Sequence, residues 1–110
     1  MEDKQKLYTY IARCLGVGDP DLVGKILLSL AENEEKKVAV RDLVDVLKVS
    51  YPTISRMINE LEALGVVRSE KERGARRRPG RPRKIIEADW EALKSKVKEC
   101  VDTLKEFLES

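Results

Sequence analysis

Hydroxyl, guanidinium and amide side chains gather near the start of residues 50–65, where they could bind a nucleic acid. Hydroxyl groups and arginine reach phosphates, whereas arginine and asparagine can form paired hydrogen bonds with base edges in a DNA groove. An ordinary amphipathic surface helix carries similar residues, so the neighbouring segments must decide between these two interpretations. The candidate DNA-contacting residues are Ser50, Tyr51, Thr53, Ser55, Arg56 and Asn59.

The same segment has the apolar spacing of a helix. Ser50 can cap its start, Pro52 suits its first turn, and Gly65 can end it in the left-handed conformation. We therefore expect a helix that turns one apolar stripe inward and the candidate residues outward. The stripe consists of Ile54, Met57, Ile58, Leu61 and Leu64.

A strongly basic segment follows this helix. Residues 68–84 hold nine basic and two acidic residues, a net charge of +7, whereas the whole chain carries +2. The remainder is therefore acidic, and a basic block on an acidic body favours a polyanionic partner. A disordered basic tail is the alternative, although structure is predicted on both sides of the segment. The residues expected to contact DNA are Arg73, Arg76, Arg77, Arg78, Gly80, Arg81, Arg83 and Lys84.

Missing residue types exclude most catalytic chemistry. The chain has no histidine, and Cys14 and Cys100 form no CxxC pair, which excludes a structural zinc site. No nucleophile beside a base, no phosphate-binding glycine loop and no carboxylate pair in an apolar pocket is visible. We expect no enzyme activity, no cofactor and no metal. We expect both cysteines to be buried free thiols, with a disulfide between the Cys100 residues of two chains as the alternative.

Length and composition fit one small protein domain. The 110 residues are 42% hydrophobic and 38% charged, which is enough to form a core with solvated faces. No apolar run approaches the length of a membrane span, and there is no signal peptide. We therefore expect a cytoplasmic, nucleoid-associated protein with no membrane partner.

The predicted order of elements is that of a winged helix-turn-helix. Helices are expected at residues 3–15, 19–31, 41–48 and 50–65. Short strands are expected at residues 38–40, 66–70 and 85–87. The last two helices meet at a tight turn, and the last two strands enclose the basic segment as a wing. The fold class is therefore mainly α with a small antiparallel β-sheet (α+β). In the first helix the predicted inward face is Leu7, Ile11, Cys14 and Leu15.

A long helix is predicted at residues 88–108. Its apolar residues repeat every three and four positions, which is typical of a helix that pairs with another helix. We expect a homodimer interface there, with packing of the same stripe onto its own domain as the alternative. The predicted single domain then divides into a first helix (1–18), a winged core (19–87) and a dimerisation helix (88–110). The interface residues are Trp90, Leu93, Val97, Cys100, Leu104 and Phe107.

The stretch RDLVDVLKVSYPTISRMINELEALGVVRSE resembles the helix-turn-helix of the MarR and ArsR winged-helix superfamily of prokaryotic transcription regulators. Lys48 departs from the family pattern, which often has glycine there, and the metal-binding sets of the metal-sensing branch are absent. The layout is similar to that of small dimeric regulators of Sulfolobales archaea. The matching residues are Leu43, Val44, Leu47, Val49, Ser50, Thr53, Ile54, Ser55, Arg56, Leu61, Gly65 and Val67.

This resemblance implies a homodimeric regulator that binds double-stranded DNA, with the helix of residues 50–65 in the major groove. The alternative is a weakly specific architectural protein of the nucleoid, which the charge of the wing favours. The sequence specifies no operator and no effector ligand. RNA is a less suitable partner, because a helix cannot enter the deep groove of A-form RNA.

Part of the wing resembles an AT-hook, whose centre is Gly-Arg-Pro between basic residues. Here that centre is Gly80, Arg81 and Pro82, although Pro79 replaces the usual preceding arginine. The resemblance implies that Arg81 enters a narrow A·T-rich minor groove. Contact of the whole loop with phosphates is the alternative.

Overall fold

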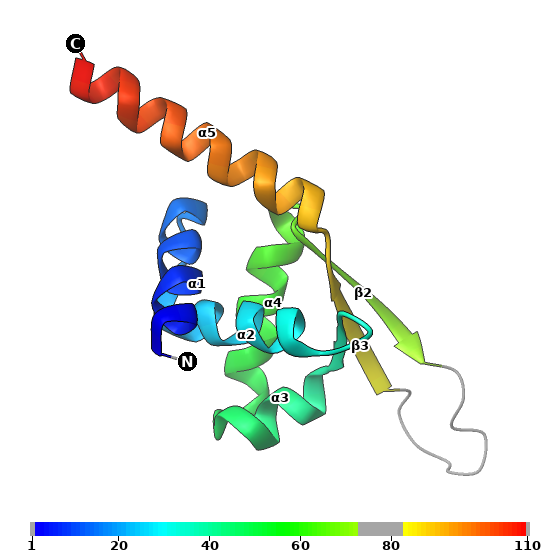
Figure 1. The fold of residues 1–110 in the computed structure, drawn as a ribbon. Coiled ribbons are helices and arrows are strands. Elements are labelled where there is room, and N and C mark those ends of the chain that lie inside the picture. Colours follow the sequence, from blue (N-terminus) through cyan, green and yellow to red (C-terminus); the bar gives the residue numbers. More distant parts are fainter. Residues whose placement is uncertain (1, 73–82, 110) are drawn as a thin grey trace, which may run out of the picture.

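The computed structural model describes residues 2–72 and 83–109, which form a helical body, a three-stranded sheet and one projecting helix (Figure 1). The helices are α1 (Glu2–Leu15), α2 (Pro20–Glu32), α3 (Val40–Leu47), α4 (Tyr51–Ala63) and α5 (Trp90–Glu109). The strands are β1 (Lys37–Ala39), β2 (Val67–Glu72) and β3 (Arg83–Ala88). The predicted winged helix-turn-helix with a small antiparallel sheet is therefore confirmed.

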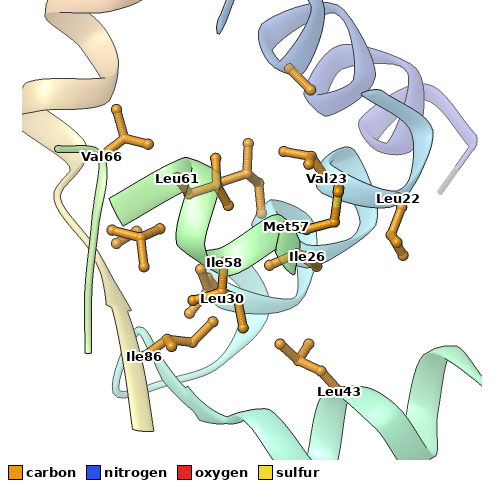
Figure 2. Close-up of a cluster of buried hydrophobic side chains, with 14 of the residues drawn as sticks. Leu22, Val23, Ile26, Leu30, Leu43, Met57, Ile58, Leu61, Val66 and Ile86 are labelled. Carbon is orange, nitrogen blue, oxygen red and sulfur yellow. The ribbon is translucent and has the colours of Figure 1, made fainter. Parts of the chain in front are cut away.

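The core lies between α2, α4 and the sheet (Figure 2). The predicted apolar stripe of α4 is buried, with Ile54, Ile58 and Leu61 fully inaccessible to solvent, except that Leu64 follows the helix and is half-buried. Ile86 of β3 closes the core from the sheet side. Burial of this stripe fixes the rotation of α4, because the opposite face must then point outward. The α2 side chains that meet the stripe are Leu22, Val23, Ile26, Leu27 and Leu30.

Helix α1 crosses α2 at close range. The close approach depends on Gly24, because a Cβ atom there would lie 2.9 Å from the backbone nitrogen of Thr9. The predicted inward face of α1 is only partly right, since Leu7 is 55% exposed whereas Ala12 and Leu15 are buried. Contact with α2 rotates α1 away from the face that helical spacing alone indicated.

The turn between α3 and α4 keeps a tight geometry without glycine. Lys48 adopts the left-handed conformation itself, with φ 58° and ψ 38°, and its N–H donates to Val44 O at 3.0 Å. Val49 packs against the core from this turn. The turn therefore keeps a tight helix-turn-helix geometry at Lys48, the position where the sequence departs from the family pattern.

The sheet has the order β1-β3-β2, and both pairs are antiparallel. Ile86 faces Val38 on one side and Ser69 on the other. Strands β2 and β3 are longer than predicted, and Val40 begins α3 rather than ending β1. Pairing between β2 and β3 continues to Glu72 and Arg83. The paired strands therefore extend into polar residues, beyond the apolar residues on which the prediction rested.

Helix α5 begins on the body and then leaves it (Figure 1). Asp89 caps its start, because the carboxylate accepts a hydrogen bond from the Ala92 N–H at 3.1 Å. Leu93 enters the core, whereas every residue from 101 to 109 is exposed. The projecting helix gives the molecule principal dimensions of 61 × 25 × 25 Å.

Candidate nucleic-acid interface

The polar face of α4 is exposed to solvent. Tyr51 is 50% exposed, Arg56 and Asn59 are exposed, and Thr53 and Ser55 are half-buried. Arg56 and Asn59 are three positions apart, so their side chains lie on adjacent turns of one face. No ion pair holds Arg56 among the described residues. The face therefore presents hydroxyl, guanidinium and amide groups together, in an arrangement that can donate to phosphates and base edges.

The start of α4 is organised by Ser50, as predicted, but through its backbone. The Ser50 carbonyl accepts the Ile54 N–H at 3.1 Å, while the Ser50 hydroxyl pairs with the Thr53 hydroxyl at 2.9 Å. The side chain thus makes no capping bond to the helix backbone. Both hydroxyls remain at the surface, beside Tyr51.

The end of α4 is fixed by a paired backbone motif. Gly65 takes φ 78°, as predicted, and its N–H donates to Glu62 O at 3.0 Å. The Val66 N–H donates to Leu61 O at 3.2 Å. These two bonds form a Schellman motif, which turns the chain directly from the helix into β2.

Two glutamates of α4 that were not among the predicted site residues, Glu60 and Glu62, attach the helix to its surroundings. Glu62 Oε1 accepts from Ser69 Oγ at 3.0 Å and lies 3.5 Å from Lys84 Nζ, which joins α4 to β2 and β3. Glu60 Oε2 accepts the Gly18 N–H at 3.2 Å. No sequence signal could have identified these contacts, because each joins distant segments of the chain.

The predicted wing contacts divide into three groups. Arg73, Arg76, Arg77, Arg78, Gly80 and Arg81 lie outside the described residues. Arg83 begins β3, opposite Glu72 of β2. Lys84 is half-buried and is held by Glu62, so its ammonium group already has an ionic partner within the chain. The strands that carry the basic segment are therefore fixed relative to the exposed face of α4.

The predicted dimer interface divides along α5. Leu93 is 4% exposed and belongs to the core of its own chain, and Trp90, Val97 and Cys100 are half-buried. The buried indole N–H of Trp90 has no hydrogen-bond partner among the described residues. The distal part of the helix is exposed, with values of 41% for Val101, 54% for Leu104, 77% for Phe107 and 79% for Leu108.

Within the described residues, no helix is long and apolar enough to cross a membrane. The same residues contain no cluster of three or more histidine, cysteine, aspartate or glutamate side chains that could hold a metal ion.

The sequence matches the model of the MarR family over residues 15–78. No curated protein matches the chain. The fold is similar to that of a transcriptional regulator homologue from Pyrococcus horikoshii, at 21% identity and a TM-score of 0.57, over 99% of this chain and 96% of that one. A MarR family transcriptional regulator from Streptomyces coelicolor, solved in complex with DNA, matches at 22% identity and a TM-score of 0.59. The match covers 96% of this chain and 66% of that one. A possible transcriptional regulator from Methanosarcina mazei matches at 15% identity and a TM-score of 0.62. The match covers 90% of this chain and 82% of that one.

Proposed function

The chain belongs to the MarR family of transcription regulators, and we propose that it acts as a homodimer on double-stranded DNA. In this proposal α4 enters the major groove and the basic segment between β2 and β3 contacts the neighbouring minor groove and phosphates. The observation that carries the proposal is the exposed polar face of α4, whose other side is buried in the core. A solved MarR family regulator bound to DNA supports the same class of partner.

Arg56 and Asn59 are the residues proposed to read bases. Both are exposed on one face of a helix that Glu60 and Glu62 attach to neighbouring segments. A rigid helix keeps the side chains at a fixed position in the groove, which paired hydrogen bonds to a base require. Tyr51 and the hydroxyls of Ser50 and Thr53 would contact the phosphates beside them.

The basic segment is proposed to add affinity that depends little on sequence. Its net charge of +7 neutralises phosphates and releases counterions. Within it, Arg81 is proposed to enter the minor groove at A·T-rich steps, on the strength of the AT-hook resemblance. This charge also favours the second candidate function, a weakly specific architectural protein.

The distal part of α5 is proposed as the dimer interface. Val101, Leu104, Phe107 and Leu108 are four apolar side chains on one stripe of an exposed helix. Such a patch on a small protein marks a site of interaction. A two-fold dimer formed there would place two copies of α4 on one duplex, as the spacing of paired half-sites requires.

The test is selection of bound duplexes from a random library, followed by affinity measurements on the selected and a scrambled duplex. We expect Arg56→Ala to lose about 1–3 kcal/mol of preference for the selected duplex. Lys25→Ala removes one charge from the exposed surface of α2 and should leave that preference unchanged. An equal loss on both duplexes for Arg56→Ala would favour the architectural function instead.

A further inference from the structure

A polar hollow lies where α1 and α2 cross, lined by side chains from residues 5–13 of α1 and 21–25 of α2. Figure 1 shows these two helices packed against each other on the side of the body away from the sheet. The hollow has a volume of about 470 Å³, which is within the size range of small-molecule sites in proteins. None of its lining residues belongs to the DNA and dimer contacts proposed above, so the hollow is a separate candidate site.

Three cations and one acid line the hollow. Lys6 and Arg13 belong to α1, while Lys25 and Asp21 belong to α2. All four residues are exposed, and no ion pair holds any of the three cations within the part of the chain that the structure describes. Their net charge of +2 differs from the surroundings, because the chain outside residues 68–84 is acidic as a whole. This charge matches the nearly two negative charges that a phosphate monoester carries at neutral pH.

An aromatic ring lines the same hollow. Tyr10 is 61% exposed, and the guanidinium carbon of Arg13 lies 5.9 Å from the centre of the Tyr10 ring. Nucleic-acid bases stack on exposed tyrosine rings and on guanidinium planes in many proteins. A ligand that carries both a phosphate and a planar base would therefore use the ring and the cations together.

Polar contacts at the helix crossing hold these groups in place. Gln5 Nε2 donates to Thr9 Oγ1 at 3.3 Å and to the Asp21 carbonyl at 3.5 Å, which joins α1 to the first turn of α2. Thr9 is buried and lines the hollow, and its hydroxyl accepts the Gln5 bond while keeping its own hydrogen to donate. The crossing is tight, since a Cβ atom at Gly24 would lie 2.8 Å from Thr9 Oγ1. The cations of the two helices are therefore carried at a fixed spacing.

We propose that this hollow binds a free nucleoside monophosphate. Its phosphate lies among Lys6, Arg13 and Lys25, and its base stacks on the ring of Tyr10. A backbone phosphate of duplex DNA matches the hollow less well, because it carries one charge and its base is stacked inside the duplex. The site is thus distinct from the DNA contacts of α4 and the basic segment, and it adds a small-molecule ligand to the proposed function.

The test titrates the full-length protein, without DNA, with adenosine 5′-monophosphate, adenosine or inorganic phosphate in a calorimeter. We expect the nucleotide to bind about tenfold more tightly than either fragment, because only the nucleotide uses the ring and the cations together. Stacking tolerates any base, so absence of nucleotide binding would overturn the proposal. Because no DNA is present, that failure would leave the proposed regulator function untouched.

The position of the bound nucleotide is checked by nuclear magnetic resonance of backbone amides. We expect the shifts that change on titration to gather at residues 5–13 and 21–25, which carry the lining side chains. The basic segment also attracts anions. Shift changes confined to residues 67–88 would mean that the nucleotide binds the wing, and the proposal would fail.

Matched variants separate the ring from the charges. Tyr10→Ala should weaken nucleotide binding about tenfold and leave phosphate binding unchanged, whereas Tyr10→Phe keeps the ring and should keep the parent affinity. Lys6→Gln and Arg13→Gln should each weaken binding of both nucleotide and phosphate. Lys4→Gln is the control, because Lys4 is exposed on α1 but does not line the hollow. If Tyr10→Ala or Arg13→Gln binds the nucleotide as the parent does, the hollow is not the site.

Discussion

The carboxylate of Glu62, near the end of α4, lies 3.5 Å from the ammonium nitrogen of Lys84 on β3. Glu62 Oε1 also accepts the hydroxyl of Ser69 on β2, so one oxygen joins α4 to both strands of the wing. In the proposed complex, α4 and the wing contact different grooves and their relative position matters. Lys84 therefore acts first as an internal partner of Glu62, although the sequence suggested only a DNA contact.

The contacts of Glu62 should contribute to the free energy of unfolding. Glu62→Gln keeps an acceptor for Ser69 but removes the charge opposite Lys84, so we expect a loss of less than about 1 kcal/mol in urea unfolding. Glu62→Ala removes both contacts and should cost more, about 1–2 kcal/mol. Glu91→Gln is the control, because the ion pair of Glu91 with Lys94 is strongly exposed. Equal unfolding free energies for the parent and Glu62→Ala would contradict this role.

The left-handed conformation of Lys48 predicts a stabilising substitution. A side chain at φ 58° brings its Cβ close to the following carbonyl, a cost that glycine does not carry. Lys48→Gly should therefore raise the free energy of unfolding by about 0.5–1 kcal/mol, after allowance for the greater freedom of glycine in the unfolded chain. Lys25→Gly, in the middle of α2, should lower it by about 1 kcal/mol. Urea unfolding should therefore show changes of opposite sign in the free energy of unfolding of the two variants, and a loss of stability in Lys48→Gly would contradict the cost assigned to the left-handed conformation.

The close crossing of α1 and α2 predicts that replacing Gly24 by alanine destabilises the protein. Gly24→Ala gains helix propensity, but the new methyl group would stand 2.8 Å from Thr9 Oγ1 and 2.9 Å from the Thr9 nitrogen. Because backbone atoms cannot move aside cheaply, we expect a net loss of about 1–3 kcal/mol in thermal or urea unfolding. Ser29→Ala on the same helix is the control and should stay near the parent value. A Gly24→Ala variant as stable as the parent would mean that α1 can shift without cost.

Periodicity and end signals predicted most of the fold. Gly65 ends α4, as its residue type indicated, and the helix predicted from residue 19 begins where Asp19 caps α2 through a bond from the Leu22 N–H at 3.2 Å. These signals are local, because the residues that make them are neighbours in the chain. The apolar stripe of α4 was equally predictable, since one continuous core covers it.

What the sequence could not supply were the contacts between distant segments. The regular stripe of α5 predicts an apolar face but not what covers it, and Leu93 enters its own core whereas Phe107 is exposed. The exposure of Leu7 depends on how α1 packs against α2, which spacing along one helix does not specify. Among the candidate DNA-contacting residues, the exposed face of α4 was predictable because it is the complement of the buried stripe.

The exposed end of α5 predicts that assembly depends on its distal half. Leu104→Glu places a charge at the centre of the apolar stripe formed with Val101 and Leu108, so burial of that stripe against a second chain becomes unfavourable. We expect light scattering to show a monomer at concentrations where the parent is a dimer, with little change in the circular dichroism of the folded domain. Thr103→Glu adds the same charge one position away, about 100° around the helix, and should remain a dimer. If Leu104→Glu assembles like the parent, the two chains meet elsewhere, and the proposed arrangement of two α4 helices on one duplex must be abandoned.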